Sequence, residues 1–207
     1  MLAGPIVIIG LALAASPGFA ETLDRIAVSV GQEVITESQI ILDLRVAAFL
    51  DQKPVDLSGA AKRKSAERLV DQLLILREAV DSHVTLPSVE ATAGLVAPYA
   101  AESGYQANLQ RYGITERDLG AHLLAGLRTL TFTDLRFRPD VQPSDEDVRS
   151  YYDKLPASAA APKPSFEDSR DQIEKLLVEQ RVIDALDQWL AMARSAANIR
   201  YRDKAFQ

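Results

Sequence analysis

The chain has 207 residues, of which 47% are hydrophobic and 25% are charged. This composition excludes an intrinsically disordered protein and predicts one ordinary globular domain, or one domain with an insertion. The formal net charge is −6 without a compensating basic stripe, which argues against a nucleic-acid partner. The absence of cysteine excludes disulfides, thiolate nucleophiles, cysteine-ligated zinc and iron–sulfur clusters.

Residues 1–20 have the features of a signal peptide. They carry no charged side chain, and the apolar stretch at residues 6–15 is about half as long as a membrane-spanning helix requires. Gly18 and Ala20 supply the small side chains that a signal peptidase accommodates. We therefore predict cleavage after Ala20, a periplasmic location and no stable membrane insertion of the mature chain. No Lys or Arg precedes the apolar stretch, which a mis-assigned start codon would explain as well as an uncleaved anchor would.

A β-hairpin and a helix are the first elements predicted after this segment. Residues 25–36 (RIAVSVGQEVIT) hold two runs rich in β-branched residues around a turn at Gly31, which is typical of a hairpin. Thr36 and Gln39 fit a capping box, so a helix should begin directly after Thr36. The proline-containing loop at residues 51–59 predicts the end of that helix.

Apolar residues at helical spacing predict a series of further helices in the middle of the chain. Thr115 and Ser144 are suited to begin two of them as capping residues. Pro98 is expected to bend or interrupt the helix that contains it. The predicted helices span residues 60–82, 89–102, 105–112, 115–137 and 144–155.

The last predicted helix, at residues 166–196, changes its apolar face along its length. At about 100° per residue, Ile173 projects from one side and Trp189 from nearly the opposite side. We therefore expect its two halves to pack in different surroundings. Ile199 and Tyr201 follow in a segment with strand character, and we expect them to join the hairpin as a third strand because a hairpin alone is marginally stable.

Together these elements predict a mainly α fold: a helical body with a small β-sheet, made by the N-terminal hairpin and a C-terminal strand and closed by the long C-terminal helix. Residues 156–165 (PASAAAPKPS) form a Pro- and Ala-rich linker before that helix. The chain thus divides into a signal peptide at 1–20, a body at 21–155, the linker at 156–165, and a helix and strand at 166–207 that complete the same domain.

Four segments, in this order, resemble the N-terminal chaperone domain of the SurA and PrsA-type parvulin foldases, a domain similar to the peptide-binding domain of trigger factor and SurA. The match covers residues 24–155. The four segments are RIAVSVGQEVITESQI, RLVDQLLILREAVDSHV, RYGITERDLGAHLLAGL and VQPSDEDVRSYYDKL.

In that family, a segment like residues 144–153 leads into a parvulin isomerase domain, and a helix like residues 166–177 returns to the chaperone body. Here only the linker at 156–165 lies between them, and it is too short for such a domain. The resemblance therefore implies a holdase without isomerase activity, not an enzyme, that binds unfolded or extended exported polypeptides, outer-membrane proteins among them. The alternative is a dedicated cell-envelope assembly or interaction partner that binds one specific peptide or protein.

Catalytic chemistry has little support in the sequence. His83 and His122 are the only histidines, and we interpret both as ordinary helix residues. We expect no catalytic residue, no metal and no cofactor; a hydrolase or isomerase with an unrecognised site is the disfavoured interpretation. Since no G-x-x-x-x-G-K motif is present, client release should occur by exchange without nucleotide.

Aromatic side chains are the candidates for peptide binding, because an aromatic ring can contact many different apolar segments. A role in the core is the simpler interpretation for each residue taken singly. The candidates are Tyr99, Tyr105, Tyr112, Phe132 and Trp189. The linker at 156–165 would also allow exchange of the last helix between two chains, which gives a homodimer as a further expectation.

Overall fold

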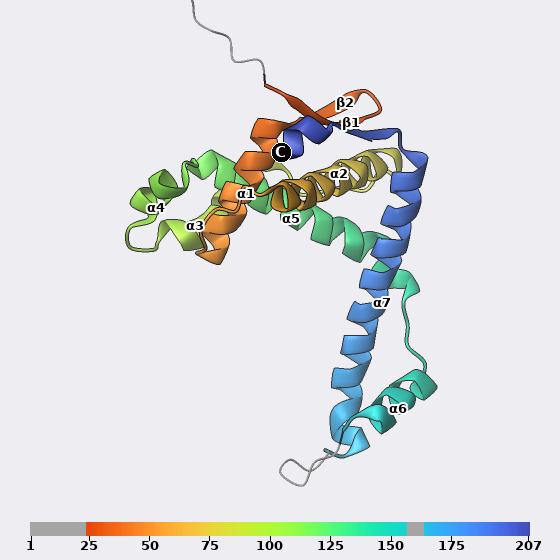
Figure 1. The fold of residues 1–207 in the computed structure, drawn as a ribbon. Coiled ribbons are helices and arrows are strands. Elements are labelled where there is room, and N and C mark those ends of the chain that lie inside the picture. The colour runs from red at the N-terminus through yellow and green to blue at the C-terminus, as the bar shows by residue number, and fades with distance from the viewer. Residues whose placement is uncertain (1–23, 157–163) are drawn as a thin grey trace, which may run out of the picture.

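The structure of the protein, a computed structural model, describes residues 24–156 and 164–207 (Figure 1). The predicted signal peptide and residues 157–163 of the predicted linker lie outside the described residues. The strands are β1 (Ile26–Val30), β2 (Glu33–Thr36) and β3 (Ile199–Tyr201). The α-helices are α1 (Glu37–Asp51), α2 (Gly59–Asp81), α3 (Thr92–Ala100), α4 (Tyr105–Tyr112), α5 (Glu116–Phe137), α6 (Asp145–Lys154) and α7 (Phe166–Ala196). Short 3₁₀ helices are η1 (Val89–Ala91), η2 (Arg138–Asp140) and η3 (Asp203–Phe206).

The three strands form one antiparallel sheet in the order β2-β1-β3. β1 is the central strand, and its neighbours come from the hairpin and from the C-terminal part of the chain. The predicted third strand at Ile199 and Tyr201 is thereby confirmed. So is the predicted fold class, a mainly helical body with this small sheet and a long C-terminal helix.

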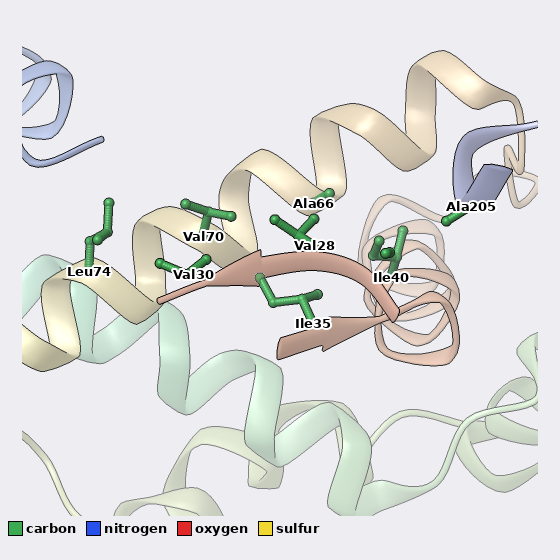
Figure 2. Packing of buried hydrophobic residues seen from close by; sticks show 9 residues of the cluster. Val28, Val30, Ile35, Ile40, Ala66, Val70, Leu74 and Ala205 are labelled. Atoms are coloured by element: carbon green, nitrogen blue, oxygen red, sulfur yellow. The ribbon is translucent and has the colours of Figure 1, made fainter. Parts of the chain in front are cut away.

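One face of the sheet packs on α2. Val28 and Val30 of β1 are fully buried and lie in one cluster with Val70 and Leu74 of α2. Figure 2 shows these side chains between the hairpin and the helix, with Ala205 of η3 beside α1. Alternation along β1 turns every second side chain toward α2, which explains why two β-branched residues are completely removed from water.

Local capping fixes where three of the helices begin. Thr36, Thr115 and Ser144 each accept a hydrogen bond from the backbone N–H three residues later and complete a capping box. The predicted helix starts are therefore confirmed at these positions. Further along, Pro98 lies inside α3 without interrupting it, and the predicted helix at 89–102 starts as the 3₁₀ turn η1 before α3.

The two halves of α7 lie in different surroundings, as its changing apolar face predicts. The first half packs beside α6 and extends away from the sheet (Figure 1), with the Phe166 ring 5.4 Å from the Tyr152 ring. The second half packs against α2 and α5, where the Trp189 and Phe132 ring centroids lie 5.3 Å apart. No helix in the described ranges is both long and apolar enough to cross a membrane.

Replacing Trp189 by Ala should lower the free energy of unfolding by about 3 kcal/mol, because this side chain contacts both the sheet cluster and the cluster around Phe132. Urea denaturation followed by circular dichroism measures the change. Met192→Ala on the same helix is the matched control, since Met192 is largely exposed and its truncation should change stability by less than about 0.5 kcal/mol. Equal stability of the two variants would contradict the packing of Trp189.

Candidate functional site

The principal candidate site is an open groove of about 840 Å³ between β2, α1, α2 and α5. Most of its lining is aliphatic, which suits it to apolar ligands. The aliphatic lining residues are Val34, Ile35, Leu42, Val46, Leu69, Leu73, Leu76, Val80, Ala121 and Ala125.

Part of this lining is open to solvent. Val34, Leu76 and Val80 expose 46%, 39% and 74% of their surface. Scattered exposed apolar residues are normal on a protein surface, but these three border one concave site together with buried apolar neighbours. The groove therefore offers apolar area that a ligand could remove from water.

A buried polar network forms part of the groove wall and joins three helices. Asp43 of α1 is only 6% exposed. Its carboxylate accepts hydrogen bonds from Ser65 and Arg68 of α2, and its Oδ1 lies 3.1 Å from Nδ1 of His122 of α5. Because a buried charge is tolerated when it is paired and hydrogen-bonded, this network fixes the positions of α1, α2 and α5 around the groove.

The surroundings of Asp43 lower its pKa below the ordinary value. Burial alone would raise the pKa, but the hydrogen bonds from His122 and Ser65, together with the charge of Arg68, outweigh it. Asp43 is therefore ionised in the folded protein at neutral pH and stabilises the fold through these contacts.

This network does not have the geometry of a Ser–His–Asp catalytic triad. In a triad the histidine lies between the serine and the aspartate, whereas here Ser65 and His122 both contact Asp43. Ser65 is also fully buried, so its hydroxyl cannot meet a substrate in this arrangement. His122 lines the groove, and its Nδ1 lies beside the Asp43 carboxylate.

His83 is not part of the Asp43 network. It follows the end of α2 in a left-handed backbone conformation with φ of 57° and is exposed, so its expected place within a helix is wrong.

Over the described ranges, the structure contains no group of three or more His, Asp or Glu side chains placed to hold a metal ion.

Three of the candidate aromatic residues gather around Phe49 of α1. The ring centroids of Tyr99, Tyr105 and Tyr112 lie 6.3, 6.4 and 5.8 Å from that of Phe49. Tyr105 is buried, while Tyr99 and Tyr112 are partly buried against the same cluster. These tyrosines therefore pack α3 and α4 onto α1.

The other two candidates meet in a separate cluster. Phe132 is fully buried, and Trp189 is partly buried beside it and Phe137. The five candidate aromatics thus form two packing clusters, and none belongs to the groove lining. Their role in peptide binding stays a prediction; sequence reasoning did not identify the aliphatic groove, because its lining comes from four separate elements with no common motif.

No family model matches the chain, and no curated protein matches it. The groove geometry is therefore the basis for the functional argument.

Replacing Asp43 by Asn should lower the free energy of unfolding by about 2 kcal/mol at pH 7, because Arg68 loses the carboxylate that pairs with its charge. The loss stays moderate because the Arg68 side chain is partly exposed to water. Since the folded-state pKa of Asp43 is depressed, its stabilisation is fully present above the unfolded pKa of about 4 and is lost as pH falls through the folded pKa. Urea unfolding at pH 7 and at pH 3 should show a difference between wild type and variant that shrinks at the lower pH. A pH-independent difference would contradict the ionised pair.

Proposed function

We propose that this protein is a periplasmic holdase chaperone that binds unfolded or extended segments of exported polypeptides, without isomerase activity. The observation that carries the proposal is the open aliphatic groove, in which Leu76 and Val80 of α2 are exposed beside Val34 of β2. An apolar wall with few directional groups suits ligands of many sequences, because burial of apolar surface needs no fixed partner geometry.

The energetics of such a groove favour transient binding. Apolar burial contributes about 25 cal/mol per Å², and much of this is offset by the loss of freedom of an unfolded client. Weak binding allows release by exchange, which fits a chain without a P-loop nucleotide-binding motif. The net charge of −6 would help to keep a loaded complex in solution.

The resemblance to the SurA and PrsA-type foldases agrees with this proposal. The segments that flank the isomerase domain in that family correspond here to α6 and the first half of α7, which pack side by side. Their contacts include ion pairs of Arg170 with Asp145 and of Arg181 with Asp147, 2.5 and 2.8 Å long. We include outer-membrane proteins among the proposed clients because of this resemblance.

The purified chain from Glu21 to Gln207 should suppress aggregation of several unrelated denatured proteins, one of them a β-barrel membrane protein, at near-stoichiometric amounts. Light scattering after dilution from denaturant measures this. Suppression restricted to a single client would favour a dedicated assembly partner over a general holdase. The absence of suppression for every client would contradict chaperone function.

Charged substitutions in the groove should abolish this suppression without unfolding the protein. In the double variant Leu76→Lys with Val80→Lys, both altered side chains are exposed, so the fold tolerates them while a charge enters the apolar wall. The matched control is Leu130→Lys with Leu135→Lys, two exposed leucines of α5 that are not part of the groove lining. Equal activity of the groove variant and the control would exclude the groove as the binding site.

A further inference from the structure

The edge of the sheet at β2 borders the groove. In the order β2-β1-β3, β2 has a strand neighbour on one side only. Glu33, Val34 and Ile35 are consecutive in β2, and all three line the groove. Consecutive side chains of a strand point to opposite faces. A groove that is lined by all three residues must therefore follow the edge of the strand.

The backbone of Val34 points toward this groove and away from β1. The N–H of Gly31 donates to the carbonyl of Asn198 and the N–H of Arg202 to that of Ala27, so alternate residues of β1 direct their polar groups to β3. By this alternation Ser29, paired with Arg200, also faces β3. Its partner across the hairpin, Val34, is then in a non-hydrogen-bonded pair and presents its N–H and C=O outward.

The residues around the hairpin supply no partner for these groups. Thr36 at the end of β2 has its N–H occupied by the Gln39 side chain, 2.8 Å away. For Val34, among the described residues, no hydrogen bond on the groove side is found. An outward N–H and C=O on one edge residue is the pattern that pairs with one residue of an added strand.

Acidic side chains outnumber basic ones in the lining of the same groove. Arg77 is the cation of the lining, and its guanidinium is already paired with Glu33 at 2.9 Å and with the Val30 carbonyl. Asp43 is paired with Arg68. Asp81 and Asp118 also line the groove, and within the described residues neither carboxylate takes part in an ion pair, although one oxygen of Asp118 accepts hydrogen bonds from Thr115. The groove is therefore complementary to a ligand that carries positive charge.

We propose, on the basis of the function proposed above, that the groove takes its client as an extended strand added to the edge of β2 at Val34, and that it favours segments carrying Lys or Arg. Backbone pairing selects the extended conformation and not a sequence. Alternate apolar side chains of the client then enter the aliphatic lining, and its basic side chain lies near Asp81 or Asp118. The preferred client is thus a basic, alternating β-forming segment.

Fluorescence anisotropy with labelled peptides of about ten residues, which span roughly 33 Å when extended, tests the charge preference. Three peptides share one alternating apolar pattern and differ only in carrying Lys, Gln or Glu at two polar positions. Binding should weaken in the order Lys, Gln, Glu, by about tenfold between the extremes at low salt, and the spread should narrow at high salt.

The double variant Asp81→Asn with Asp118→Asn should bind the three peptides equally. Asn at position 118 keeps a side-chain oxygen for the cap on Thr115. Asp184→Asn with Asp187→Asn, two exposed carboxylates of α7 outside the groove, is the charge-matched control and should keep the preference.

The Val34→Pro variant tests the added strand, because proline removes the outward N–H and leaves the pairing of β2 with β1 intact. Its affinity for the Lys peptide should fall about fivefold to tenfold, whereas Val34→Ala, which keeps the N–H, should lose no more than about twofold. If the proline variant fails to fold, the same test can be made on the wild-type protein with two peptides, each N-methylated at every second amide in one of the two possible registers. One of the two methylated peptides should bind about fivefold to tenfold more weakly than the unmethylated peptide.

The outcomes separate the two proposals. If no peptide binds at all, the proposed function itself fails. If peptides bind without charge preference, the preference for a basic client is refuted. If neither Val34→Pro nor N-methylation in either register weakens binding, the added strand is refuted. In both cases the protein still binds polypeptide.

Discussion

The pairing of β1 with β3 is the interaction on which the rest of the structure depends. β3 follows α7 almost directly, so its pairing with β1 anchors the C-terminal end of that 31-residue helix at the sheet. Anchored there, α7 brings Trp189 against both the sheet cluster and the cluster around Phe132. Without β3 the hairpin would be a marginal two-stranded unit, and the C-terminal end of α7 would lose its attachment to the sheet.

The groove follows from how the sheet and three helices are held. Val28 and Val30 fix the sheet on α2, and the buried carboxylate of Asp43 connects α1, α2 and α5. These contacts hold the surrounding elements, while the apolar residues on the open side of β2 and α2 are left partly uncovered. The hydrogen-bonded network of Asp43 connects the helices in the wall, and the partly exposed apolar surface beside it offers contacts that need no fixed partner geometry.

Much of the fold could be predicted from the sequence because its determinants are local. The caps at Thr36, Thr115 and Ser144 involve residues three positions apart, and the two faces of α7 can be read from helical spacing. The groove could not be predicted in this way, since Asp43, Ser65 and His122 meet only through tertiary packing. The aromatic side chains proposed for binding, such as Phe132, pack in the clusters because large rings bury the most apolar area there.

Hydrogen exchange with mass spectrometry, in the presence and absence of an unfolded client held in solution, tests the central claim most directly. If the groove binds the client, exchange should slow in residues 33–46, 69–81 and 118–125, which contain its lining, and stay unchanged in α6 and the first half of α7. Slowed exchange confined to α6 and α7, with the groove segments unaffected while the client is bound, would contradict the account.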